Sequence, residues 1–173
     1  MVKRIIVGLF GIVAILGVFW VAKAEAAEAT RPDCSEFAGL PKPQSTCFRK
    51  RKLAVRYANY DALQKTGLEF AYLARPVEGK ELEKAYPDAA KAAKDKVEGK
   101  FLITFSVNTD GNVYDVKVVE ASSQPISHLA RLWADTIAQW KFVKPGKAVT
   151  DVPFRRVYLY SDEDSDKDRR SGG

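Results

Sequence analysis

The chain has 173 residues, of which 46% are apolar and 29% are charged, with a formal net charge of +6 at pH 7. These values suit one globular domain with appendages and exclude a fibrous or wholly disordered protein. Residues 1–24 hold three basic residues and no acid, so the rest of the chain carries only +3, which argues against a nucleic-acid partner.

The first 24 residues have the pattern of an export signal. Lys3 and Arg4 precede an uncharged apolar run at residues 5–22, and small-x-small sites that signal peptidase accepts follow it. We predict a signal peptide that is cleaved, with an uncleaved, single-pass inner-membrane anchor as the alternative. The basic start stays in the cytoplasm in either case, so the remaining chain is expected in the periplasm.

The chain has two cysteines, Cys34 and Cys47, just after this segment. In an oxidising compartment they predict a structural disulfide that closes a short loop. The spacing is not that of a redox C-x-x-C motif, and His128, the sole histidine, lies far away in sequence.

A basic run at residues 49–56 opens a helical pattern that we place at residues 52–74. Gly67 falls inside this pattern and is a point at which it divides. The apolar residues expected to face inward are Leu53, Tyr57, Tyr60, Leu63, Leu68 and Tyr72. Arg49, Lys50, Arg51, Lys52 and Arg56 then form either the solvated face of the helix or a patch for anionic lipid or cell-wall polymer, and the solvated face is favoured.

Changes in residue type along the sequence divide the chain into four parts. Residues 1–24 are the signal or anchor, and residues 25–80 are a disulfide-closed helical extension. Residues 81–160 form the main domain, which opens with a helix at residues 82–96 interrupted near Tyr86 and Pro87. Residues 161–173 contain no apolar side chain, so we expect this tail to be disordered.

The main domain contains a β-hairpin. Apolar residues alternate along residues 99–107, which is the period of a half-buried strand. Asp110 and Gly111 provide the turn residues, and a second strand follows at residues 113–119.

A helix and a last strand complete the domain. Ser123 caps a helix at residues 125–140. One apolar stripe of that helix is formed by Ile126, Leu129, Ala130, Trp133, Ile137 and Trp140. Trp133, Trp140 and Phe142 are expected in the core. The last strand is predicted at residues 152–160.

No set of residues predicts catalysis. The chain lacks the motifs of serine hydrolases, zinc proteases, phosphate-binding loops and dinucleotide-binding folds. Glu120 and Asp135 are carboxylates that nothing in the sequence brings together, and His128 is expected on the surface or partly buried. We therefore predict a protein that is not an enzyme, without a cofactor or metal site.

Over residues 82–160 the chain resembles the C-terminal domain of TonB-type proteins. The residues that carry the resemblance are Tyr86, Pro87, Ala89, Ala90, Glu98, Gly99, Asp110, Gly111, Val116, Val118, Ser122, Ser123, Trp140, Lys141, Phe142, Pro145, Gly146, Val152 and Pro153. The resemblance implies an α+β fold in which a three-stranded antiparallel sheet packs on one main helix, with an N-terminal helical extension.

The resemblance also implies a binding surface. In TonB-type domains the last strand pairs with a short segment near the N-terminus of an outer-membrane transporter. The matching residues here are Val152, Phe154, Arg155, Arg156, Val157 and Tyr158. Arg155 and Arg156 either attract an acidic partner segment or protect the edge from unwanted pairing. An open edge also allows a homodimer by strand exchange.

The sequence departs from energy-transducing TonB proteins in two respects. Their anchor carries a serine and a histidine that residues 5–22 lack, and their long proline-rich spacer is missing here. We therefore favour a periplasmic protein-binding module that grips an outer-membrane or periplasmic partner by edge-strand pairing. The alternative is a membrane-anchored short energy transducer, and a weaker one is a peptidoglycan-binding envelope protein that uses the basic run.

Overall fold

The structure is a computed structural model that describes residues 32–162. The predicted signal or anchor and all but two residues of the predicted tail lie outside this range. The elements are η1 (Ser35–Phe37), α1 (Pro43–Thr66), β1 (Phe70–Tyr72), α2 (Gly79–Ala85), α3 (Pro87–Lys94), β2 (Gly99–Val107), β3 (Val113–Ala121), α4 (Gln124–Ile137), β4 (Lys141–Phe142) and β5 (Val149–Tyr158). Within residues 32–162, every helix is too short or too polar to span a bilayer.

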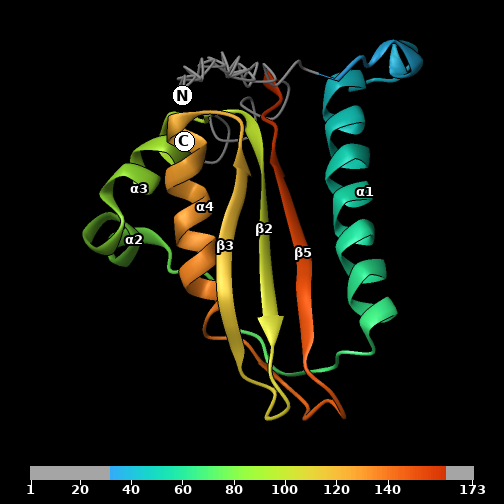
Figure 1. The fold of residues 1–173 in the computed structure, drawn as a ribbon. Coiled ribbons are helices and arrows are strands. Elements are labelled where there is room, and N and C mark those ends of the chain that lie inside the picture. Colours follow the sequence, from blue (N-terminus) through green and yellow to red (C-terminus); the bar gives the residue numbers. More distant parts are fainter. Residues whose placement is uncertain (1–31, 163–173) are drawn as a thin grey trace, which may run out of the picture.

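The centre of the fold is a three-stranded antiparallel sheet in the order β3-β2-β5 (Figure 1). Together with the helices that cover it, this sheet confirms the predicted α+β fold. The predicted turn joins β2 to β3, and the Asn108 side chain accepts hydrogen bonds from the backbone N–H groups of Asp110 and Asn112. Gly111 has φ of 80°, and a Cβ there would lie 2.0 Å from the Phe142 carbonyl oxygen, so glycine is required.

Helix α4 covers one face of the sheet and forms the main core with it. Buried residues of β2 (Phe101, Ile103, Phe105, Val107) meet buried residues of α4 (Ile126, Leu129, Ala130, Ile137). The Ser123 hydroxyl accepts a hydrogen bond from the Ile126 N–H at 3.4 Å, which confirms the predicted cap. The helix ends at Ile137, earlier than predicted.

Trp140 and Phe142 are buried as predicted, although they lie beyond the end of α4. The Trp140 indole N–H donates to the Ala74 carbonyl oxygen at 3.0 Å, so the ring has a polar partner inside the core. Trp133 is only partly buried and packs at the margin of this core.

Helices α2 and α3 lie beside α4 at the β3 side of the sheet (Figure 1). They break at Tyr86, as the sequence predicted, because Pro87 occupies the first position of α3 and restricts the residue before it. Tyr86 also donates a hydrogen bond from its hydroxyl to the Asp135 carboxylate of α4 at 2.9 Å. The break in the helix therefore positions a side chain that ties α3 to α4.

Helix α1 differs from the prediction in its bounds. It begins at Pro43 rather than residue 52 and ends at Thr66, where Gly67 adopts a left-handed conformation (φ 71°). After it, β1 pairs with β4, with Phe70 opposite Phe142. This two-stranded sheet was not predicted.

The predicted inward face of α1 was largely wrong. Leu53, Tyr57, Tyr60 and Tyr72 are exposed, whereas Leu68 is buried and Leu63 packs on the main core. A 24-residue helix beside a narrow sheet touches it along one thin stripe only. Most of its large side chains therefore stay in water.

Candidate protein-binding edge

The sheet has two edge strands, β3 and β5, and they differ in how they are protected. On β3 the pairing register with β2 shifts twice, and Asp115 has a positive φ of 52°. The strand also carries exposed charges, such as Lys117 and Glu120. Bulges and charges disfavour pairing with another strand, so the β3 edge protects itself by irregularity.

The β5 edge is regular from Val152 to Tyr158, after one register shift near Asp151, which has a positive φ of 55°. The side chains of this stretch divide between two sides. Val152, Phe154 and Tyr158 face the main core, and Phe154 lies 5.3 Å from Trp133 between ring centres. The Trp133 indole N–H donates to the Tyr158 hydroxyl at 3.0 Å. Burial raises the pKa of Tyr158 above its ordinary value of 10.0. These residues hold β5 in place.

The two arginines of the predicted site do different things. The Arg156 guanidinium lies 4.2 Å above the centre of the Trp133 ring, on the core side. Arg155 is exposed and lies with Val157 on the other side, where both line a cavity shared with α1. The structure therefore splits the six predicted site residues, and only Arg155 and Val157 face α1.

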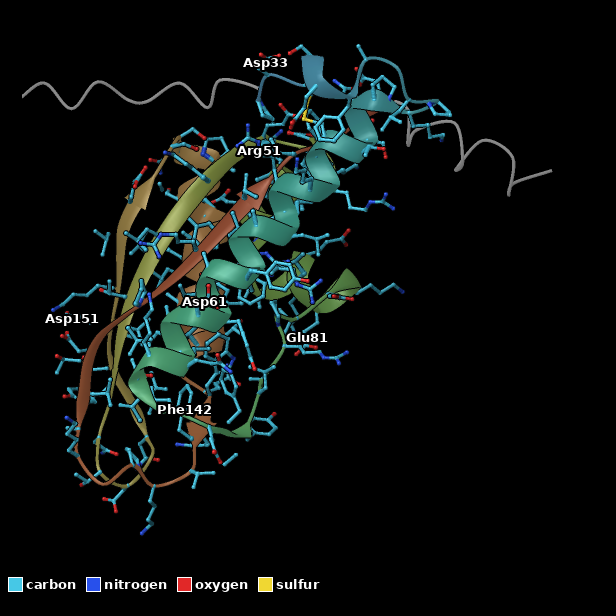
Figure 2. The ribbon with its side chains drawn as sticks, turned by 90° about the vertical axis from the view of Figure 1, so that its right-hand side faces the viewer. Asp33, Arg51, Asp61, Glu81, Phe142 and Asp151 are labelled. Atoms are coloured by element: carbon cyan, nitrogen blue, oxygen red, sulfur yellow. A yellow bond between two sulfur atoms is a disulfide. The ribbon has the colours of Figure 1, made fainter. Side chains whose placement is uncertain are left out.

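Helix α1 lies along the outer side of β5, as Figure 1 shows and the rotated view of Figure 2 confirms. Midway along the contact, the Asn59 side chain bonds the backbone of Arg155 twice. Its amide nitrogen donates to the Arg155 carbonyl oxygen, and its amide oxygen accepts from the Arg155 N–H, both at 2.8 Å. Because backbone groups alternate direction along an antiparallel strand, these are the groups that point away from β2.

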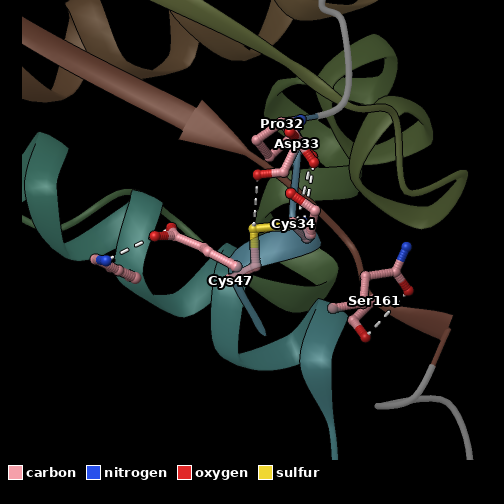
Figure 3. Close-up of a disulfide and its surroundings, with 9 residues drawn as sticks. Pro32, Asp33, Cys34, Cys47 and Ser161 are labelled. Carbon is pink, nitrogen blue, oxygen red and sulfur yellow. Dashed lines mark hydrogen bonds and ion pairs between the residues drawn. A yellow bond between two sulfur atoms is a disulfide. The ribbon is translucent and has the colours of Figure 1, made fainter. Parts of the chain in front are cut away.

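The start of α1 is fixed to the end of β5 by a small second core. Cys47, Phe48 and Leu159 are buried there, and Phe37 and Val157 pack against them. The predicted disulfide between Cys34 and Cys47 joins the segment before α1 to this core (Figure 3). In the first residues of the predicted tail, the Ser161 hydroxyl and the Asp162 backbone N–H both donate to the Gln44 side-chain oxygen.

Between the second core and Asn59, a cavity of about 510 Å³ lies between α1, β5 and the start of β2, where Gly99 and Lys100 line it. Ala54, Val55 and Ala58 line it from α1 and Val157 from β5. The alanines are too small to fill the space. Arg51 and Arg155 also line it, so the cavity is apolar with basic groups beside it.

The predicted basic run lies on α1 and is exposed throughout. Lys50 forms an ion pair with Glu36 at 3.5 Å, and the Lys52 ammonium lies 5.9 Å from the centre of the Tyr160 ring. These contacts are at the surface, where ion pairs contribute little to stability. The run is thus exposed on α1, and Arg51 is a member that lines the cavity shared with β5.

The other polar residues named from the sequence take part in polar contacts within the described range. Glu120 pairs with Lys100 at 3.3 Å, whereas Asp135 accepts from Tyr86, so the two carboxylates serve separate contacts. His128 is partly buried and lies 3.8 Å from the Asp88 carboxylate. Within residues 32–162, no cluster of three or more metal-ligating side chains occurs.

Asn59 is the residue of this candidate edge that the sequence analysis did not name. The side of α1 toward β5 carries Val55, Asn59, Ala62 and Thr66, all half-buried and spaced by three or four residues. This stripe is visible in the sequence, but its small and polar residues give a weak signal beside the large apolar residues that turned out to be exposed.

Comparison with known proteins gives one family. The sequence profile described as Gram-negative bacterial TonB protein C-terminal matches residues 83–157, which is less than half of the chain. Two similar solved structures are solution NMR structures of the TonB C-terminal domains of Pseudomonas aeruginosa and Helicobacter pylori. The first is 17% identical over 56% of this chain and 87% of its own (TM-score 0.34), and the second is 29% identical over 50% and 89% (TM-score 0.35). No curated protein matches the sequence.

Proposed function

Because residues 83–157 form a domain of the TonB C-terminal family, which in TonB proteins binds outer-membrane partners, we propose that this protein is an envelope protein-binding module. The family is a protein-interaction family and not an enzyme family. In the proposed function, an extended segment of an outer-membrane or periplasmic protein pairs with β5 along residues 152–158. Backbone hydrogen bonds provide the affinity of such strand addition, and side-chain contacts provide its specificity.

The observation that supports this proposal is the hydrogen bonding of the Arg155 backbone. Its N–H and C=O groups point away from the sheet and are bonded by a side-chain amide, which has the same donor and acceptor as a peptide group. A partner strand would offer the same two groups at this position. The β3 edge lacks this regularity, since its register shifts twice within nine residues.

We place the protein in the periplasm. The Cys34–Cys47 disulfide supports this, because disulfides persist in oxidising compartments. Proteins of the TonB family are periplasmic or envelope-associated. The alternative of an anchored energy transducer depends on residues 1–24, which lie outside the described residues.

The test is site-specific photo-crosslinking. A benzophenone amino acid replaces Arg155 on β5 in one variant and Lys117 on β3 in a matched control, since both side chains are exposed. Each protein is mixed with detergent-solubilised outer membranes of the species that makes it, and crosslinked partners are identified by mass spectrometry. We expect position 155 to capture an outer-membrane protein through one extended segment, and position 117 to capture none.

Two outcomes would contradict the proposal. Crosslinks from position 117 alone would move the binding surface to the opposite edge of the sheet. Crosslinks from position 155 that scatter over many unrelated proteins would mean that β5 does not recognise a defined segment.

A further inference from the structure

Strand addition at β5 faces an obstacle in the same chain, because α1 already occupies that edge. Along β5, residues whose backbone groups bond β2 alternate with residues whose backbone groups point outward. Arg155 belongs to the outward-pointing set. Pro153, two residues earlier, has no N–H to offer, which is typical of an edge strand. Leu159, just past the strand, is buried against Cys47 and Phe48. A pairing segment therefore meets α1 at Arg155 and again at Leu159, just past the strand.

The contact that closes the edge is one that a strand can replace. At Arg155, α1 contributes two hydrogen bonds from a side-chain amide. An incoming backbone would contribute two of the same kind, so the exchange leaves no donor or acceptor unpaired. This matters because leaving a buried backbone group unpaired typically costs more than the net gain of one hydrogen bond.

The middle of the α1–β5 contact is also loosely filled. The cavity beside Ala54, Ala58 and Val157 holds about 510 Å³, so few apolar atoms touch there. Atoms without neighbours gain no dispersion energy, and separating the two elements at this point loses little. The firm attachment of α1 lies elsewhere, at the disulfide and the second core.

We propose that α1 is a displaceable cover of the β5 edge, with Asn59 as its latch, and that a partner segment must replace this helix in order to pair. The inference rests on the proposed function, since it concerns the regulation of the same edge. The occupant is an extended segment with acidic side chains, because Arg51 and Arg155 line the cavity that opens as α1 moves.

The first arm of the test needs no partner. Amide hydrogen exchange at Arg155 is measured by NMR in the full chain as wild type, Asn59→Ala and Tyr57→Ala. Tyr57 is an exposed residue of α1 and provides a control with the same replacement. Loss of the latch should speed exchange at Arg155 about tenfold or more, as expected from the loss of one or two net hydrogen bonds, while Tyr57→Ala leaves it unchanged.

A second variant acts in the opposite direction. Ala58→Leu places a larger apolar side chain into the cavity between α1 and β5 and should hold the cover more firmly. Exchange at Arg155 should then slow by several-fold relative to wild type. Equal exchange in Asn59→Ala and Tyr57→Ala, with no slowing in Ala58→Leu, would overturn the proposal.

The second arm measures access for a partner. The crosslinker at position 155 is combined with Asn59→Ala or with Ala58→Leu, and each protein is mixed with solubilised outer membranes as above. Crosslinking yield should rise several-fold in the first combination and fall in the second. Equal yields in all three proteins would overturn the cover and leave edge pairing intact. No crosslinks even with Asn59→Ala would overturn both the pairing and its regulation.

Discussion

At the scale of single residues, the two tryptophans beside β5 differ in how much they stabilise the fold. Trp140 is 3% exposed and meets the rings of Phe70, Phe105 and Phe154 at 5.3–5.8 Å. Trp133 is partly buried, with its face under the Arg156 guanidinium. Trp140 is therefore a central core residue, whereas Trp133 supports β5 from the margin.

We predict that Trp140→Ala lowers the free energy of unfolding by about 3–5 kcal/mol, the typical cost of truncating a buried tryptophan. Trp133→Ala should cost less, because part of that ring is already in water. Urea denaturation of both variants followed by circular dichroism measures the difference. A larger loss at Trp133 would contradict the assignment of the core.

Tyr158 gives a prediction for alkaline pH. Burial raises the pKa of its hydroxyl above 10.0 in the folded state, while the unfolded chain has the ordinary value. The folded state therefore disfavours the phenolate. The stability that results is complete below about pH 10 and is lost as the pH rises through the pKa of the folded state.

Between pH 9 and pH 12, we expect the free energy of unfolding to fall less in Tyr158→Phe than in wild type. Part of the fall remains in the variant, because the pKa values of Tyr86 and Tyr160 are also raised. Urea midpoints across that pH range measure it. Identical pH profiles of the two proteins would mean that Tyr158 ionises in the folded state as easily as in the unfolded chain.

At the scale of elements, the Cys34–Cys47 disulfide fixes the start of α1. It joins the segment before the helix to its first turns, next to the second core. We predict that Cys34→Ser/Cys47→Ser lowers the free energy of unfolding by about 3 kcal/mol, the chain-entropy value for a loop of this size. Thermal unfolding measures it, and wild type under reducing conditions should match the variant. An unchanged Tm would assign the fixing of α1 to the second core alone.

The elements of the main domain were predictable because their signals are local. Alternation along β2, the Asp110–Gly111 turn and the Ser123 cap each depend on a few neighbouring residues, and the structure has all three. The predicted ends of helices and strands were less accurate, since β5 begins at Val149, before the predicted start.

The cover over β5 could not be predicted, because its contacts join distant residues. Asn59 and Arg155 lie 96 positions apart, and an asparagine in a polar helix carries no periodic signal. The pairing of β1 with β4 was missed for a related reason. Two or three residues are too short to display a strand period.

At the scale of the whole molecule, the chain combines a region that matches the TonB C-terminal family model, residues 83–157, with a helix that lies on its proposed binding edge. We predict that the mature protein begins near Glu25 or Ala27, since the sites for signal peptidase lie there. Intact mass and N-terminal sequencing of protein from the periplasmic fraction check this. An intact chain from Met1 in the membrane fraction would instead support the anchored transducer.

The position of α1 ahead of the sheet in the chain has a consequence for synthesis. A new chain emerges from its N-terminus, so Asn59 is present long before Arg155. Before β5 forms, β2 is the open edge at that side of the sheet, and once β5 pairs with β2 the helix is already present to cover the new edge. A newly made chain can therefore cover the β5 edge as soon as that edge exists, which shortens the time in which β5 can pair with another chain. The order of the elements in the chain thus limits exposure of the β5 edge before any partner is met.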